Sequence, residues 1–291
     1  MLTIKEHETL APKTTMRIGG LARYYAELES KEDVEEAHKF AKDKNIPLIV
    51  FGAGSNTIFA DGTINALVVR IKASNVIIPS PNPNPIIVES GKNLAQLVNE
   101  LADQGLDLST LTGIPGTFGG AVIGNAGQGS GGTWIDSYIE SVTVFDAGEW
   151  KEMSKDECKF SYRESIFKKN SMIIWSAKLK LPNSEPHLIK TQIEYLLQKR
   201  ISDQPHVKTS GSCFKAADNG TPAWQLIEKA ELRGFRIGGV HVSEKHSNFL
   251  INDEDGSFED VVNIINTIKE SAPDVGAVEM RLIGEDGKLV V

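Results

Sequence analysis

The chain has 291 residues, of which 40% are hydrophobic and 24% charged, and its formal net charge at pH 7 is −8. This composition is that of an ordinary globular protein of about two domains, and it excludes the disordered, fibrous and membrane classes. The acidic balance argues against nucleic acid or an anionic membrane as a partner, because such surfaces depend on clustered Lys and Arg.

The sequence also indicates where the protein works. Cys158 and Cys213 lie far apart, without CxxC or zinc-ligand spacing, and His241 and His246 have no carboxylate in a metal-ligand pattern. No stretch approaches the roughly 20 apolar residues of a membrane helix, and the N-terminus lacks a signal-peptide core. We therefore expect a cytoplasmic protein without a metal site or a membrane anchor.

The first half of the chain alternates helices with several strands. Ser30 and Asp33 form a capping-box pattern, and Val34 and Ala37 follow at helical spacing. We expect helices at 30–44 and at 93–106, the second ended by Gly105, and strands at 48–51, 66–71, 139–146 and 172–182, with a proline-rich loop at 80–85 before a further strand.

The composition changes near residue 183, where a long helix with a basic end begins. Helices are expected at 186–204, 222–232 and 257–271, and strands at 237–242, 248–252 and 277–283. The pattern of many strands and fewer helices predicts an α+β fold. We expect two domains, 1–182 and 183–291.

The stretch GAGSN is the first candidate ligand loop, and it contains Gly52, Gly54, Ser55 and Asn56. Glycines permit positive φ, and successive main-chain amides can form a nest for an anion such as a phosphate. Thr57 stands where a dinucleotide fingerprint needs its third glycine, so neither the Rossmann nor the Walker A pattern applies. A plain turn after a strand remains the alternative.

The stretch GIPGTFGGAVIGNAG, residues 113–127, is the second candidate loop. Its glycine content predicts that it cannot form a good helix, and it carries no acid–base group. Two interpretations stay open at this point: tight turns packed against another strand, or a wall against which a large ligand lies.

The ordered series TTMRIGG, FGAGSN, GIPGTFGGAVIGNAG, YRESIF, GSCFK, RIGGVHVSEKHSNFLIN and VEMRLIG resembles the UDP-N-acetylenolpyruvoylglucosamine reductase family of peptidoglycan precursor synthesis. The resemblance implies an FAD-binding module of the vanillyl-alcohol-oxidase type in 1–182. A smaller substrate domain would follow in 183–291, and it is open whether its last strand packs back on the first domain. NADPH would reduce the flavin, which would reduce the enolpyruvyl nucleotide to UDP-N-acetylmuramate.

The resemblance also implies which main-chain segments wrap the flavin. The implied cofactor residues are Gly52, Gly54, Ser55, Asn56, Gly113, Ile114, Pro115, Gly116, Gly119, Gly120, Asn125 and Gly127. The length is similar to the shorter form of the family, which lacks a substrate-covering loop.

Three residues match the catalytic positions of the family. Arg163 would bind the enolpyruvyl carboxylate and stabilise the enolate, Ser212 would donate the proton, and Glu279 would assist protonation. Each has a plainer alternative from sequence alone: a surface arginine beside Glu164, a turn serine with Ser210 as competitor, and a solvent-facing strand glutamate.

The resemblance gives substrate-binding roles to Tyr162, Lys215, Lys245, His246 and Asn248. Where the family usually has Asn-Pro after the GSCFK stretch, this chain has Ala216 and Ala217, and its GNAGQGSGG stretch is unusually rich in glycine. A related FAD-dependent oxidoreductase with another substrate and a catalytically impaired nucleotide-binding homologue therefore remain alternatives. We expect a monomer or a weak homo-oligomer.

Overall fold

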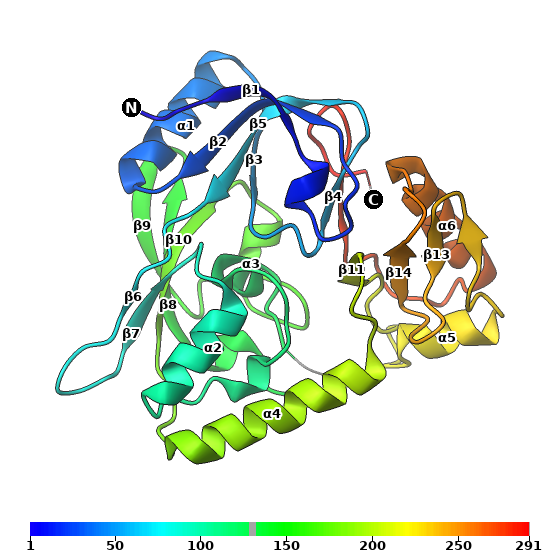
Figure 1. Ribbon diagram of the computed structural model, residues 1–291. Coiled ribbons are helices and arrows are strands. Elements are labelled where there is room, and N and C mark those ends of the chain that lie inside the picture. Colours follow the sequence, from blue (N-terminus) through cyan, green and yellow to red (C-terminus); the bar gives the residue numbers. More distant parts are fainter. Residues whose placement is uncertain (128–131, 291) are drawn as a thin grey trace.

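The computed structural model describes residues 1–127 and 132–290. Its N-terminal part is a four-stranded sheet in which the parallel strands β2, β5 and β3 are flanked by an antiparallel β1 (Figure 1). The strands are β1 Lys5–Thr9, β2 Leu21–Leu28, β5 Thr63–Ile71 and β3 Leu48–Phe51, and helix α1 spans Lys31–Asp43. Ser30 and Asp33 form the expected capping box, and Val34 and Ala37 are buried against this sheet.

A second, antiparallel sheet with the order β6-β7-β10-β8-β9 carries the largest core. Its strands are β6 Val76–Ile77, β7 Ile86–Glu89, β10 Ile173–Leu179, β8 Ile139–Asp146 and β9 Glu149–Ser154, and the helices on it are α2 Leu94–Asp103 and α4 Pro186–Asp203. Leu97 and Leu101 of α2 are fully buried in this core. Gly105 adopts φ +71° just after α2, as its predicted place at the end of the helix requires.

The third sheet forms a separate lobe (Figure 1). Its strands are β11 Thr209–Ser212, β14 Phe249–Asn252, β13 Val240–Val242 and β12 Arg236–Ile237, and its helices are α5 Ala223–Lys229 and α6 Phe258–Ser271. Helix α6 begins with a capping box of Ser257 and Asp260, and its buried face of Val261, Ile264 and Ile268 packs on the lobe.

Two elements connect the lobes. Helix α4 buries Ile189 and Ile193 in the core of the second sheet, and its C-terminal end reaches the third sheet (Figure 1). Strand β15, Arg281–Ile283, returns to pair in parallel with β4, Thr57–Phe59. The division at residue 183 stays a prediction, and the packing of α4 favours a boundary after that helix.

Two sequence-based expectations were wrong in detail. The glycine-rich segment does form a short helix, α3 Phe118–Ile123, with Thr117 Oγ1 accepting a hydrogen bond from the Gly120 N–H at 3.3 Å. Burial of Phe118 and Val122 in the second core offsets the poor helix propensity of glycine. The strand expected at 277–283 is regular only over Arg281–Ile283.

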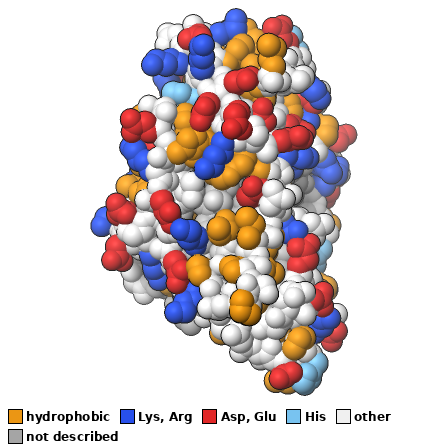
Figure 2. Space-filling view, turned by 90° about the vertical axis from the view of Figure 1, so that its left-hand side faces the viewer, with side chains coloured by type: hydrophobic (Ala, Val, Ile, Leu, Met, Phe, Trp, Pro, Cys, Tyr) orange, Lys and Arg blue, Asp and Glu red, His pale blue; other side chains and the backbone are white. Residues whose placement is uncertain are grey.

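The surface carries mixed charges. Figure 2 shows Lys and Arg interspersed with Asp and Glu over one face of the molecule, with small apolar patches between them. Across residues 1–127 and 132–290, none of the helices combines the length and the apolar character needed to traverse a bilayer.

Candidate active site

Arg163 lies at the centre of a tight turn. Ser161 and Glu164 exchange two main-chain hydrogen bonds of 3.1 Å, and Arg163 between them adopts φ +55°. The left-handed conformation of a non-glycine residue costs on the order of 1 kcal/mol, so the surrounding structure must hold it. Asn125 does so in part, because its Nδ2 donates to the Ser161 carbonyl at 2.9 Å.

Arg163 contacts Glu279 across the two lobes. Its Nε lies 3.2 Å from Oε1 of Glu279, whose side chain is 16% exposed. Burial raises the pKa of Glu279, and the positive charge of Arg163 opposes this effect only in part. The carboxyl therefore keeps its proton to a higher pH than an ordinary glutamate, as a proton-delivering site requires.

Ser212 ends β11, next to the segment that carries Glu279. The Glu279 N–H donates to the Cys213 carbonyl at 2.7 Å, and Phe214 pairs with Val278 in an antiparallel bridge. The structure thus brings Ser212 and Glu279 to neighbouring main-chain positions, with Arg163 against the carboxylate. The buried Cys213 has its pKa raised by desolvation to about 12, so it stays a neutral thiol at physiological pH.

The predicted substrate residues divide into two groups. Lys215 lies by the Arg163 turn, where its Nζ pairs with the Glu164 carboxylate, and the exposed Tyr162 ring lies 5.9 Å from the Trp134 ring. Both therefore belong to the immediate surroundings of Arg163.

The other three candidates lie around β13 and β14. Lys245 Nζ donates to the Ile201 carbonyl at 2.6 Å, and the His246 ring packs edge-on against Phe249 with centroids 4.9 Å apart. Burial lowers the pKa of His246. The buried amide of Asn248 binds both main-chain groups of Phe214, at 3.0 and 2.9 Å. Substrate contacts of these three residues stay predictions.

The two glycine loops contact each other. A Cβ on Gly52 would lie 2.3 Å from Thr117 Oγ1, and one on Gly116 would lie 2.8 Å from Ser55 Oγ. Ser55 Oγ also donates to the Pro115 carbonyl at 3.2 Å. Close packing of the two loops therefore requires glycine at both positions, and contacts of Gly52 and Gly116 with a cofactor stay predictions.

The other glycines of the second loop differ in how closely they are packed. Gly119 packs on Ser90 and Gly127 on Trp134, in both cases too closely for a Cβ. Gly120 is exposed and its nearest neighbouring atom would be 3.5 Å from an added Cβ. Gly120 therefore leaves room beside the main chain, as a wall for a ligand would.

The first loop fits an anion. The main-chain N–H groups of Ala53, Gly54 and Ser55 donate to no acceptor among the described residues, and Gly54 adopts φ +67°. Consecutive unpaired amides of this kind form an anion nest. Asn56 differs, because its Nδ2 donates to the Glu279 carbonyl at 2.9 Å and so ties this loop to the segment that carries Glu279.

Arg200 is a site residue that the sequence reasoning missed. It lies at the end of α4, and a Cβ on Gly113 would be 2.6 Å from its Cδ. Desolvation, with a smaller contribution from Arg163, lowers the pKa of Arg200 to about 10. No carboxylate among the described residues pairs with it, and a half-buried unpaired cation fits an anionic ligand. A basic residue at the end of a helix gave no signal of this role.

Comparison with known proteins shows the family of this chain. The C-terminal domain of UDP-N-acetylenolpyruvoylglucosamine reductase matches residues 203–282, and an FAD binding domain matches residues 22–153. The reductase of Clostridium tetani is 35% identical over 97% of this chain and 93% of its own, and that of Chlamydia muridarum is 35% identical over 97% and 95%. The chain belongs to the UDP-N-acetylenolpyruvoylglucosamine reductase family.

The fold of this family is seen directly in a solved relative. The crystal structure of the reductase from Thermus caldophilus superposes with a TM-score of 0.82 at 28% identity, covering 97% of this chain and 98% of that one. The expected α+β fold with an FAD-binding first part is confirmed, and the matched FAD binding domain contains both glycine loops.

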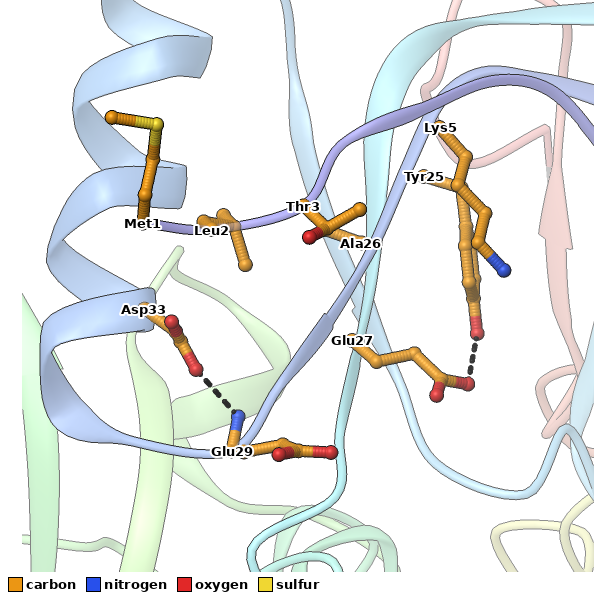
Figure 3. A pocket seen from close by; sticks show the side chains of 9 residues that line it. All are labelled: Met1, Leu2, Thr3, Lys5, Tyr25, Ala26, Glu27, Glu29 and Asp33. Atoms are coloured by element: carbon orange, nitrogen blue, oxygen red, sulfur yellow. Dashed lines mark hydrogen bonds between the residues drawn. The ribbon is translucent and has the colours of Figure 1, made fainter.

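A pocket of about 300 Å³ lies elsewhere, between α1, β2 and the N-terminal segment (Figure 3). Its polar groups bind one another: Tyr25 Oη donates to Glu27 Oε1 and the Glu29 N–H to Asp33 Oδ2, both at 2.9 Å. None of the residues that line this pocket belongs to the candidate active site.

The described residues contain no group of three or more His, Cys, Asp or Glu side chains that could hold a metal ion. The glycine-rich departure from the reductase family includes residues 128–131, which lie outside the described residues.

Proposed function

We propose that the chain reduces the enolpyruvyl ether of UDP-N-acetylglucosamine enolpyruvate to UDP-N-acetylmuramate, with FAD as cofactor and NADPH as reductant. The observation that carries this proposal is the contact of Arg163 with Glu279, beside the end of the strand that carries Ser212, in a chain of the reductase family. The reaction needs charge stabilisation and a proton donor besides the redox group, and these residues supply both.

The cofactor would lie against the two glycine loops. FAD, when bound, supplies the hydride that it has received from NADPH. The amides of Ala53, Gly54 and Ser55 and the guanidinium of Arg200 are suited to diphosphate oxygens, which both FAD and a UDP nucleotide carry. Gly120 leaves the space beside the second loop that a large ligand needs.

The protein's own residues then have distinct tasks. Arg163 binds the carboxylate of the enolpyruvyl group and stabilises the negative charge that develops when the double bond is reduced. Ser212 donates the proton to the substrate carbon. Glu279, buried and with a raised pKa, holds a proton beside this serine and orients the group to which it is delivered.

The remaining features of the proposal follow from the reaction. The substrate is a UDP sugar with an enolpyruvyl ether, and the product is a peptidoglycan precursor. We place the reaction in the cytoplasm and expect a monomer or a weak homo-oligomer, with neither a nucleic acid nor a membrane as a partner.

Separate measurement of the two half-reactions tests the proposal. The purified protein should be yellow with a flavin spectrum, and in stopped flow NADPH should bleach the flavin and the enolpyruvyl nucleotide should restore its colour. A colourless protein that takes up no FAD would contradict the cofactor assignment. A flavin that NADPH reduces but this nucleotide does not reoxidise would favour another substrate or an impaired homologue.

A further inference from the structure

Glu164, the residue after Arg163, carries a carboxylate between two ammonium groups. Its Oε1 accepts a hydrogen bond from Lys215 Nζ and lies 4.0 Å from Lys168 Nζ. Burial raises the pKa of Glu164, but the bond from Lys215 and the charges of Lys168, Lys215 and Lys169 together bring it below its ordinary value. Glu164 is therefore ionised, and both of its partners come from the site.

Lys168 also contacts the Arg163 turn directly. Its Nζ donates to the Arg163 carbonyl at 2.5 Å, the main-chain group of the residue in the left-handed conformation. The side chain of Lys168 is 26% exposed, and burial lowers its pKa. A cation bound both to this carbonyl and to Glu164 holds the turn at two points.

The Glu164–Lys215 pair crosses between lobes. The Arg163 turn follows β9 of the second sheet, whereas Lys215 follows β11 of the third sheet and donates its main-chain N–H to Ala277 at 2.9 Å. The pair thus joins the Arg163 turn to the segment after β11, which is itself hydrogen-bonded to the segment that carries Glu279. Partly buried ion pairs are screened less by salt than exposed ones.

The carboxylate of Glu164 offsets part of the positive charge around Glu279. Four charged groups act on Glu279: the cations of Arg163, Lys168 and Lys215, and the carboxylate of Glu164. Without Glu164 the three cations would repel one another with only Glu279 among them.

We propose that Glu164 is a positioning residue, which through Lys168 and Lys215 holds the Arg163 turn against the strand end that carries Ser212 and Glu279. This inference rests on the proposed function. It assigns Glu164 no contact with substrate or flavin.

The first test is Glu164→Gln in the flavin-loaded full chain. Flavin content and flavin reduction by NADPH should match the wild type, while reoxidation by the enolpyruvyl nucleotide should slow by about 10- to 100-fold, because small misplacements of catalytic groups have effects of this order. Glu164→Asp, which keeps the charge, should restore part of the rate. An unchanged reoxidation rate would overturn the inference.

The pH dependence of reoxidation separates positioning from simple loss of structure. Removing the negative charge of Glu164 lowers the pKa of Glu279. In Glu164→Gln, the pH at which the reoxidation rate falls on the alkaline side should therefore be lower than in the wild type. In Lys168→Met, which removes a positive charge, this alkaline fall of the reoxidation rate should move to higher pH. Lys180→Met, at an exposed lysine whose charge acts on neither Glu164 nor Glu279, is the control that should leave rate and profile unchanged. If the pH–rate profiles of Glu164→Gln and Lys168→Met do not shift in opposite directions, the inference is overturned.

A double-mutant cycle of Glu164→Gln and Lys215→Met in urea unfolding needs no turnover. Coupling between the two changes is expected, and additive effects would overturn the inference. A wild-type chain that does not reduce the nucleotide would refute the proposed function, while this cycle would still judge the role of Glu164.

Discussion

Arg163 Nε lies 3.2 Å from Glu279 Oε1, in a contact between residues of different lobes. The distance permits ion pairing, but the geometry does not satisfy a hydrogen bond from Nε. The contact therefore compensates the burial of Glu279 only in part, and the pKa of the carboxyl stays raised.

Glu279 should make the stability of the fold depend on pH. Because its pKa is raised in the folded state, the native chain binds this proton more tightly than the unfolded chain does. Stability from this group is present below the unfolded pKa and is lost as pH rises through the folded pKa, by roughly 1.4 kcal/mol for each unit of difference. Urea unfolding of Glu279→Gln between pH 4 and 8 should lack this loss, whereas the exposed Glu140→Gln should retain it.

Arg163→Lys should keep the charge but lose the bidentate geometry. We expect kcat/KM for the enolpyruvyl nucleotide to fall about 10- to 100-fold, as for the loss of a hydrogen bond to a charged group. Flavin content should not change. The surface variant Arg236→Lys, at a residue that pairs with Asp253, should have normal kinetics, and normal kinetics in Arg163→Lys would argue against the carboxylate-binding role.

Ser212→Ala should separate the two half-reactions. Flavin reduction by NADPH is expected to continue at the wild-type rate, while reoxidation by the nucleotide slows by about 100-fold or more, the usual contribution of a general acid. Ser210→Ala is the matched control, because the buried Ser210 Oγ has no hydrogen-bond partner among the described residues. Stopped-flow absorbance measures both steps, and equal slowing of both would refute the assignment of Ser212.

The glycine loops should respond to alanine in opposite ways. Gly54→Ala places a Cβ 2.5 Å from the Lys13 carbonyl oxygen at a residue with φ +67°, so it should destabilise the fold. Gly120→Ala meets no close atom and should leave the melting temperature unchanged or raise it slightly, but it should weaken FAD retention if the flavin lies there. Unchanged retention in Gly120→Ala would place the flavin away from α3.

The contribution of the N-terminal cap of α6 to the free energy of unfolding should be measurable on its own. Ser257 Oγ accepts from the Asp260 N–H at 3.1 Å, and Asp260 Oδ2 accepts from the Ser257 N–H at 2.9 Å. Ser257→Ala should lower the free energy of unfolding by about 1 kcal/mol. Thr267→Ala, at a half-buried residue inside α6, should have a smaller effect in the same urea titration.

Local structure was predicted well from local patterns. The helix from Ser30 and the turn at Gly105 follow from capping and apolar spacing, which act over a few residues. The glycine-rich segment was the exception. Its intrinsic propensity argued against a helix, and only burial of Phe118 and Val122 in the second core explains why α3 forms.

By itself, the sequence determined the family, the α+β fold and the identity of Arg163, Ser212 and Glu279 as candidates, because residue types and the order of motifs carry that information. Only the tertiary structure decided that Glu279 is largely buried against Arg163, that Asn125 and Asn56 hold main-chain segments beside this pair, and that Glu164 and Arg200 lie near it. Desolvation and ion pairing depend on atoms that meet in space from distant segments, and no spacing along the chain records those meetings.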